Sequence, residues 1–237
     1  MKHFMEPKSV AIIGISRRSG PGSYNLMENM INYGYTCKIF PINPKAKDIL
    51  GVKAYPNVKD VGQEIDLAII SLPRDLVVES VKESIDAGVK AIIVVTQGFA
   101  DADARGKALQ QEMVNAARNN GVRVLGPNTL GIVNNFNGFT TSFMPLTREK
   151  APVGLICQSG IFFVGAAVFT GQIGKGIDIG NACDIGFCEA LEYMGDDPEI
   201  KIIVIHMEGL EQTRRFLSLT DRIAKQKPII VFKTGQS

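Results

Sequence analysis

The stretch that most constrains the fold runs from residue 9 to residue 22. Residues 10–13 are apolar at every position, which is typical of a central parallel strand covered on both faces. A loop with three glycines follows, and a helix is expected to begin near Ser23. The N–H groups and positive dipole end of such a helix attract anions, so we expect a phosphate group to bind at this turn. The glycines do not match the dinucleotide spacing Gly-x-Gly-x-x-Gly, and a turn without a ligand is the alternative.

Apolar runs of strand length alternate with segments of helical period along most of the chain. Strands are predicted over residues 10–13, 37–42, 65–72, 90–96, 121–125, 153–157, 176–179, 200–207 and 228–232. Helices are predicted over residues 24–33, 75–87, 101 or 103 to 119, 159–172, 185–194 and 212–225. This alternation predicts an α/β fold with parallel strands and right-handed crossovers, in which ligands bind at the polar turns after the strands.

Residues 134–150 interrupt the alternation. They are polar, contain Gly138 and Pro145 and show no sustained period. We therefore expect a linker here, between a first domain of residues 1–133 and a second domain of residues 151–237. The second domain holds fewer strands and ends directly after an apolar run, so we expect it to be incomplete.

The composition is that of an ordinary globular protein, since 45% of the 237 residues are hydrophobic and 21% are charged. The net charge of +2 does not indicate a nucleic-acid surface. The four cysteines form no C-x-x-C pair and only two histidines are present, so we expect no metal site, and free thiols in the cytoplasm. No apolar run approaches ~20 residues and no signal peptide is recognisable, so we expect no contact with a membrane.

Lysine side chains follow the second predicted strand, in the turn Asn43-Pro44-Lys45-Ala46-Lys47. A nicotinamide-binding fold normally offers an acid to the ribose hydroxyls at this place, and none is present. A lysine suits a phosphate on the ribose instead, as in NADP or in the 3'-phosphorylated adenosine of coenzyme A. Lys45 lies next to the strand end, whereas Lys47 is equally consistent with a solvated loop.

A second turn between a strand and a helix lies at Gln158-Ser159-Gly160. It resembles the nucleophile elbow of a serine hydrolase, but the G-x-S-x-G spacing is absent and His206 is the only candidate base. The other interpretation, which we favour, is a second phosphoryl site in which Ser159 and backbone N–H groups at the helix start donate to the anion.

Motifs along nearly the whole chain resemble, in their order, those of one family. They are Val10-Ala11-Ile12-Ile13-Gly14-Ile15-Ser16 with Arg17 and Arg18, Pro41-Ile42-Asn43-Pro44-Lys45, Gln97-Gly98-Phe99, Gly126-Pro127-Asn128-Thr129-Leu130-Gly131, Gln158-Ser159-Gly160, Gly180-Asn181 with Asp184, and Glu208-Gly209. This set resembles the α part of the nucleoside-diphosphate-forming acyl-CoA synthetases, the group of ADP-forming acetyl-CoA synthetase and succinyl-CoA synthetase.

The resemblance implies that the first domain is a Rossmann-like unit that binds coenzyme A, followed by a truncated flavodoxin-like ligase domain. It implies that the nucleotide and pyrophosphate lie at the two turns of the first domain, and that the adenine and pantetheine lie beside the ends of its third and fourth strands. The acyl-transfer end is implied to lie between the domains. The implied cofactor-binding residues are Gly14, Ile15, Ser16, Arg17, Arg18, Ser19, Asn43, Lys45, Leu72, Pro73, Gly98, Phe99 and Asn128.

In this family a histidine on a mobile loop is phosphorylated and passes the phosphoryl group to ADP, which an ATP-grasp partner subunit or domain holds with magnesium. The resemblance implies that the phosphohistidine rests at Ser159 and Gly160, beside Glu208, which orients it. The sequence departs from the family in two places. The family's histidine lies beyond residues 233–235, where this chain has no matching residue, and Cys157 replaces the usual serine of the phosphate turn.

The resemblance therefore predicts the CoA-binding part of an ADP-forming acyl-CoA synthetase, which interconverts acyl-CoA, ADP and phosphate with a carboxylic acid, CoA and ATP. Alone it is expected to be inactive, because His206 lies within a strand and is expected to be structural. A stand-alone CoA-binding or regulatory module is one alternative, and an NADP-dependent oxidoreductase is another. Exposed apolar surface on the second domain is expected to favour a homo- or hetero-oligomer. No residue specifies the acyl group.

Overall fold

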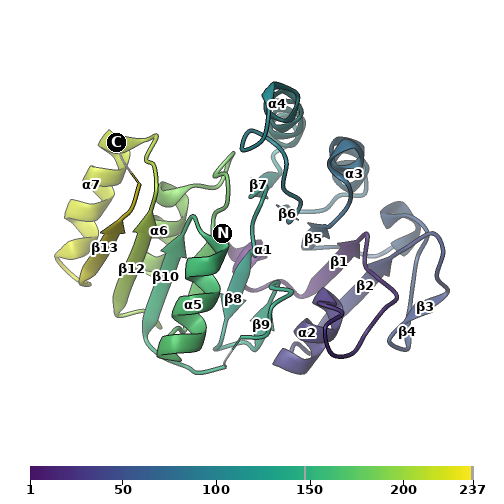
Figure 1. Cartoon of the computed structure of the whole chain (residues 1–237), viewed down its shortest axis with the longest axis horizontal. Coiled ribbons are helices and arrows are strands. Elements are labelled where there is room, and N and C mark those ends of the chain that lie inside the picture. Colours follow the sequence, from purple (N-terminus) through teal and green to yellow (C-terminus); the bar gives the residue numbers. More distant parts are fainter. Residues whose placement is uncertain (147, 236–237) are drawn as a thin grey trace.

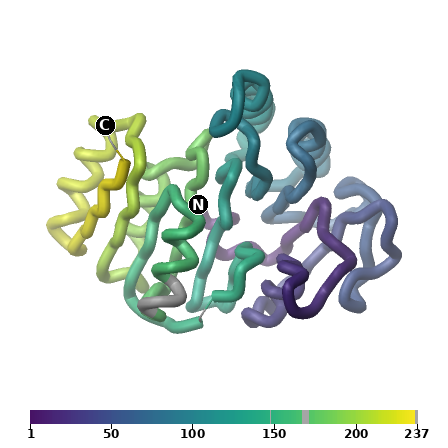
Figure 2. Tube along the Cα trace, viewed as in Figure 1, coloured from purple at the N-terminus to yellow at the C-terminus, as the bar shows by residue number. Residues whose placement is uncertain are grey.

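The computed structural model describes residues 1–146 and 148–235, with the side chains of helix α5 described as far as residue 166. Figure 1 shows two α/β units side by side, the first coloured from purple to teal and the second from green to yellow. The trace in Figure 2 places the N-terminus between the two units and the C-terminal strand in the part of the second unit that lies farther from the first.

Most helices and strands predicted from periodicity are present, with ends shifted by a few residues. The strands are β1 (Ser9–Ile13), β2 (Lys38–Ile42), β3 (Asp48–Ile49), β4 (Val52–Lys53), β5 (Leu67–Ile70), β6 (Ala91–Val94), β7 (Arg123–Leu125), β8 (Ile132–Asn134), β9 (Phe139–Thr140), β10 (Val153–Cys157), β11 (Lys175–Asp178), β12 (Ile202–Met207) and β13 (Ile229–Lys233). The helices are α1 (Lys2–Met5), α2 (Leu26–Tyr33), α3 (Arg74–Asp86), α4 (Ala104–Asn119), α5 (Gly160–Thr170), α6 (Phe187–Asp196) and α7 (Thr213–Ala224), with a 3-10 turn η1 (Val58–Val61).

The first sheet has the strand order β2-β1-β5-β6-β7, and all of its neighbouring strands are parallel. Every residue of β1, β5 and β6 is buried, because α3 and α4 lie on one face of the sheet and α2 on the other (Figure 1). Ile13 at the end of β1 pairs with Ile42 of β2 and with Ile70 of β5. The turns that follow these three strands therefore meet at one edge of the sheet, where parallel sheets bind ligands.

The second sheet has the order β13-β12-β10-β11-β8-β9. Strands β10 to β13 are parallel to one another, whereas β8 pairs antiparallel with β11 and β9 pairs antiparallel with β8. Residues 134–150, expected to form a linker without a sustained period, contain β9 and the end of β8, which the sequence analysis did not predict. These strands have three and two residues, too few to show a period of two. The position of the domain boundary stays a prediction.

A continuous apolar core joins the two units. Ile12, Ile69 and Ile93 of the first sheet belong to the same buried cluster as Ile156 and Ile177 of the second sheet. The N-terminal helix α1 adds to this contact, since it packs against strands of both sheets, β6 and β8. The two sheets therefore share one apolar core.

A buried carboxylate ties the first unit to the second. The Asp184 side chain is 1% exposed and accepts hydrogen bonds from Arg118 Nε at 2.8 Å, from Arg123 Nε at 2.8 Å and from the Val124 N–H at 2.9 Å. Burial alone raises the pKa of Asp184, but the hydrogen bonds from Arg123, Val124 and Arg118 outweigh burial and hold that pKa below its ordinary value. Asp184 is therefore a charged link between α4, β7 and the second unit.

Strand β13 forms the outer edge of the second sheet. Three of its large apolar side chains, Ile230, Val231 and Phe232, are 47%, 45% and 50% exposed. An apolar edge strand of this kind is a surface on which further chain can pair or pack.

Across residues 1–146 and 148–235, no helix is both long and apolar enough to cross a lipid bilayer.

Candidate functional site

The turn after β1 brings the backbone close to the neighbouring strand end. Gly14 has a φ of +83°, and a Cβ atom there would lie 2.3 Å from the Ser71 carbonyl oxygen and 2.7 Å from Leu72 Cδ2. Both the left-handed conformation and the lack of space require glycine. The sequence Val-Ala-Ile-Ile-Gly therefore ends β1 at the point where β5 also ends.

The loop between β1 and α2 is fixed by Asn25, which sequence analysis did not single out. Its side-chain amide donates to the carbonyl oxygens of Ser16 at 2.9 Å and Arg18 at 2.8 Å, and its oxygen accepts from the Glu28 N–H at 3.0 Å. Asn25 is thus the N-cap of α2, so the helix starts later than the expected position near Ser23. The Asn-x-x-Glu spacing of a capping box was the available signal.

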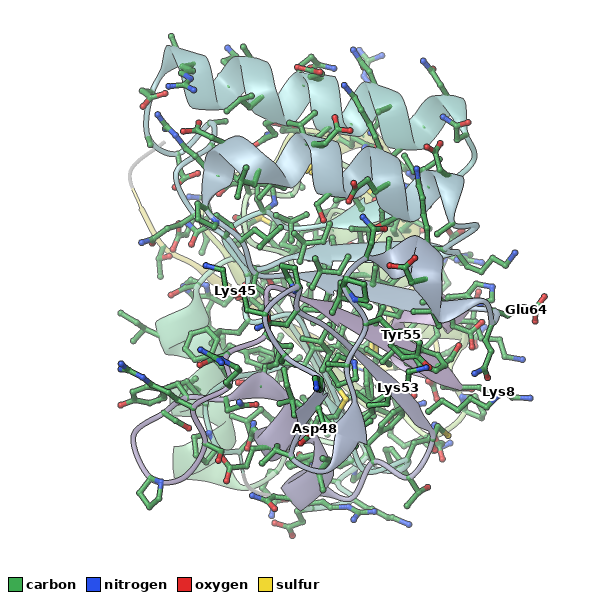
Figure 3. All side chains as sticks on the ribbon, turned by 90° about the vertical axis from the view of Figure 1, so that its right-hand side faces the viewer. Lys8, Lys45, Asp48, Lys53, Tyr55 and Glu64 are labelled. Atoms are coloured by element: carbon green, nitrogen blue, oxygen red, sulfur yellow. The ribbon has the colours of Figure 1, made fainter. Side chains whose placement is uncertain are left out.

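The turn after β2 contacts the first turn through Asn43. Its amide donates to the Ile15 carbonyl oxygen at 2.9 Å, and its oxygen accepts from the Lys45 N–H at 2.8 Å. Figure 3 views this edge of the sheet and shows Lys45 at the surface, above the β3–β4 hairpin that carries Asp48 and Lys53. The Lys45 ammonium group is therefore available to an anionic ligand at this edge of the sheet. We call this place, formed by the turns after β1 and β2, the first corner.

A cavity of about 450 Å³ lies at the ends of β1, β2 and β5. Four of the predicted cofactor-binding residues border it: Gly14, Asn43, Lys45 and Leu72. Apolar side chains from the strand ends and from α3 form much of its wall, and Glu79, Ser80 and Glu83 of α3 add polar groups. This combination of an apolar slot with a few polar groups suits a flat nucleobase with a phosphorylated ribose.

The other predicted residues of the first unit do not line this cavity. Ile15 is buried, residues 16–19 are exposed in the loop before α2, and Pro73 is the N-cap residue of α3. The Gly98 carbonyl accepts a hydrogen bond from Arg74 at 2.7 Å, and the Phe99 side chain is fully buried in the core. Gly98 and Phe99 border neither this cavity nor the one between the units. Their role as ligand-binding residues stays a prediction.

The turn Gln158-Ser159-Gly160, which we call the second corner, lies in a cavity of about 1030 Å³ between the two units. Asn128 from the first unit lines it, together with Ser159, Gly160 and Glu208 from the second. The structure thus brings together four predicted residues that are up to 80 positions apart in the sequence. The Ser159 hydroxyl accepts a hydrogen bond from the Phe162 N–H at 3.3 Å and so caps the start of α5.

Gln158 positions the turn that carries Glu208. Its side-chain oxygen accepts hydrogen bonds from the N–H groups of Glu208 at 2.8 Å and Gly209 at 2.9 Å. The exposed Glu208 is therefore held at the mouth of the cavity by a residue next to Ser159.

Asp178 is a second carboxylate of this cavity, and sequence analysis did not identify it. It ends β11, is 1% exposed, and accepts hydrogen bonds from the N–H groups of Leu130 at 2.8 Å and Gly180 at 3.3 Å. Burial raises the pKa of Asp178 to about 6, the hydrogen bonds oppose this shift in part, and the charge of Glu208 adds to it. Within an expected strand of residues 176–179, no sequence signal shows that this side chain faces α5.

His206 is held inside the second sheet, as expected for a structural residue. The residue is 5% exposed, its ring stacks on Phe162 with 4.3 Å between the ring centres, and its Nε2 lies 3.1 Å from Thr234 Oγ1. Its neighbour in the sheet, Cys157, is also buried, and this burial raises the pKa of the thiol well above its ordinary value. His206 does not line the cavity of Ser159, which disfavours a serine hydrolase.

For the residues whose placement is described, no group of three or more His, Cys, Asp or Glu side chains is arranged to hold a metal ion. The polar groups of both corners are instead amides, a lysine, backbone N–H groups and carboxylates. The amides, the lysine and the backbone N–H groups can donate hydrogen bonds to an anion.

Both units match known domain families. The CoA binding domain matches residues 8–135, and the succinyl-CoA ligase like flavodoxin domain matches residues 150–237. The fold and its two corners therefore define a two-domain protein of the CoA-ligase class. The chain belongs to the family of the CoA-binding α part of the ADP-forming acyl-CoA synthetases. The predicted resemblance and the predicted α/β fold class are both confirmed.

The relatives are ADP-forming ligases. The chain is 36% identical to subunit alpha of ADP-forming acetate–CoA ligase I of Pyrococcus furiosus, over 100% of this chain and 53% of that subunit. It is 35% identical to ADP-forming acetate–CoA ligase II of Archaeoglobus fulgidus, over 100% of this chain and 36% of that protein. The chain therefore spans between about a third and about half of the length of these curated relatives.

A solved structure supports the same grouping. The acetyl-coenzyme A synthetase 1 of Candidatus Korarchaeum cryptofilum, in complex with phosphate and ADP, superposes with a TM-score of 0.90 at 32% identity. The match covers 100% of this chain and 52% of that one. The similarity thus includes both units and the arrangement between them.

Proposed function

We propose that this chain is the CoA-binding and phosphate-handling part of an ADP-forming acyl-CoA synthetase. The observation that carries the proposal is the cavity between the units, where Asn128 of the first unit meets Ser159, Gly160 and Glu208 of the second. Acyl-CoA cleavage by phosphate needs a thioester and an anion side by side. Asn128 lies on the side of the nucleotide-binding unit, and the start of α5 supplies donors for the anion.

Coenzyme A is the proposed cofactor, bound at the corner after β1 and β2. The turn Asn43-Pro44-Lys45-Ala46-Lys47 after β2 lacks the acid that a nicotinamide nucleotide normally meets there, and it offers Lys45 to a ribose phosphate. The family match over residues 8–135 supports CoA rather than NADP.

The proposed reaction has three steps. A phosphate oxygen attacks the acyl carbon of acyl-CoA, the carbon–sulfur bond breaks, and CoA leaves as the thiolate. The resulting acyl phosphate gives its phosphoryl group to a histidine and releases the carboxylic acid. The phosphohistidine then gives the group to ADP to form ATP.

We propose that an ATP-grasp partner subunit or domain supplies the Mg-ADP site, and that the carrier histidine lies outside the described residues. The basis is His206, which is stacked, hydrogen-bonded and buried in a strand, so it cannot travel between two sites. Exposed apolar residues on β13 support association with further chain. The four free cysteines support a cytoplasmic location.

Calorimetric titration of the chain with CoA and with NADP tests the cofactor. We expect CoA to bind and NADP to give no heat of binding. Adding an ATP-grasp partner with acyl-CoA, phosphate and ADP then tests the reaction, and we expect ATP only when a protein with the carrier histidine is present. NADP binding without CoA binding would refute the proposal.

A stand-alone CoA-binding module is the second candidate, favoured by the engaged state of His206. It predicts CoA binding without turnover in any combination of partners. The same experiment therefore separates the two functions.

A further inference from the structure

A buried carboxylate lies where the proposed phosphoryl group is to bind. Asp178 lines the cavity between the units together with Ser159 and Glu208. Its Oδ2 is 3.7 Å from the position that a Cβ atom would take at Gly160, the first residue of α5. An anion at the start of α5 therefore meets the Asp178 carboxylate in the same part of the cavity.

The charge of Asp178 is not balanced by a cation. Across the described parts of the chain, no ion pair joins it to a lysine, arginine or histidine. Its carboxylate accepts hydrogen bonds from neutral groups, namely the backbone N–H groups of Leu130 and Gly180, the Thr129 side chain and the Cys157 thiol. An ionised Asp178 would repel a bound anion across a protein interior that screens charges poorly.

The titratable groups nearest to Asp178 in the sheet and in the cavity come from β10, from β12 and from the turn after β12. Cys157 of β10 pairs with Asp178 in the sheet, and its sulfur lies 4.0 Å from Asp178 Oδ1. On its other side, Cys157 pairs with His206 of β12, and Glu208 follows the end of β12. Burial keeps the Cys157 thiol neutral by raising its pKa, and Glu208 raises the pKa of Asp178. Burial and the charge of Glu208 therefore both favour the protonated form of the Asp178 carboxyl group.

We propose that Asp178 takes up a proton when an anion binds at the start of α5 and donates its carboxyl O–H to that anion. The proton comes from water and returns to water when the anion leaves, so no other reactant is required. This inference rests on the proposed function, because it concerns the proposed phosphoryl pocket. It makes phosphate binding dependent on pH through a residue of the protein rather than through phosphate alone.

Equilibrium dialysis with radiolabelled sulfate tests the proposal, because sulfate stays a dianion over the range measured. The protein is saturated with CoA to fill the first corner. For the unchanged protein, we expect the affinity to fall about tenfold between about pH 7 and about pH 8. We expect Asp178→Asn to bind sulfate with an affinity that does not change over this range. Asp196→Asn removes an exposed carboxylate from α6 and is expected to keep the pH dependence of the unchanged protein.

Calorimetry of the unchanged protein in two buffers with different heats of protonation keeps the test valid if Asp178→Asn does not fold. We expect uptake of close to one proton per sulfate at about pH 7. Sulfate binding without proton uptake, or an unaltered pH dependence in Asp178→Asn, would overturn the inference and leave the proposed function standing. Absence of sulfate binding at every pH would overturn the proposed phosphoryl pocket and the inference together.

Discussion

The side-chain oxygen of Gln158 accepts a hydrogen bond from the Glu208 N–H at 2.8 Å, across 50 positions of sequence. The same oxygen accepts from the Gly209 N–H at 2.9 Å. Gln158 immediately precedes Ser159 at the start of α5, so one amide fixes the distance between the proposed anion site and the carboxylate opposite it. The position of Glu208 relative to the start of α5 therefore depends on the Gln158 side chain.

Replacing Gln158 with leucine should slow phosphoryl transfer in the reconstituted enzyme by about 10-fold to 100-fold, because small displacements of positioned groups are costly. CoA binding should not change, since Gln158 lies in the second unit. The rate of ATP formation and a CoA titration measure the two effects. Gln111→Leu, which removes an exposed glutamine from α4 that bonds Asn115, is the matched control and should affect neither. Equal losses in both variants would contradict the positioning role of Gln158.

Replacing Asp184 with asparagine should lower the free energy of unfolding by about 3 kcal/mol, because two arginines would lose the buried carboxylate that links the units. Chemical denaturation at neutral pH measures this loss. The control is Asp196→Asn, whose side chain is 68% exposed and makes a 3.9 Å ion pair, and its effect should be below about 1 kcal/mol.

The contribution of Asp184 to the free energy of unfolding should also depend on pH. Its pKa is lowered in the folded protein, so the unfolded chain binds the proton more readily. The stabilisation is therefore complete above the ordinary pKa of 3.8 and is lost as the pH falls through the lower folded pKa. The difference in unfolding free energy between the unchanged protein and Asp184→Asn should shrink with acidification. A difference that grows towards low pH would refute this assignment.

Replacing Gly14 with alanine should destabilise the protein and weaken CoA binding, because the new Cβ would lie 2.3 Å from the Ser71 carbonyl oxygen. Gly51 provides a matched control: its φ of +75° is similar to that of Gly14, but no atom lies within 4 Å of its Cβ position. Gly51→Ala should cost about 1 kcal/mol from backbone strain alone, and Gly14→Ala should cost more. Thermal unfolding and CoA titration measure the comparison, and equal costs would show that the close approach at Gly14 is unimportant.

The two strand-to-helix turns could be predicted because each begins within two residues of an apolar strand run, whereas the binding roles of their residues stay predictions. Gly14 and Ser159 are recognisable in the sequence, since an apolar run followed by glycine or serine marks a strand-to-helix turn. Asp178 could not be singled out, because Leu130 and Gly160, which lie beside its carboxylate, are brought near it only in the folded chain. Short strands such as β9 were also unpredictable, because pairing with a neighbouring strand stabilises them rather than their own sequence period.

Replacing Ser80 with alanine should stabilise the protein without ligand by about 1 kcal/mol, because its buried hydroxyl has no hydrogen-bond partner among the described residues. Ser84, one turn later on α3, is the matched control, since it is also buried but its hydroxyl donates to the Ser80 carbonyl oxygen at 2.7 Å. Ser84→Ala should therefore destabilise by a similar amount. Urea denaturation measures the change in the free energy of unfolding for each variant, which should be an increase for Ser80→Ala and a decrease for Ser84→Ala.

Ser80 also borders the proposed nucleotide cavity. A ligand that bonds its hydroxyl should therefore bind Ser80→Ala more weakly than the unchanged protein, whereas Ser84→Ala should keep its affinity for the ligand. Destabilisation by Ser80→Ala in the absence of ligand would show that the hydroxyl has a partner in solution, for example water.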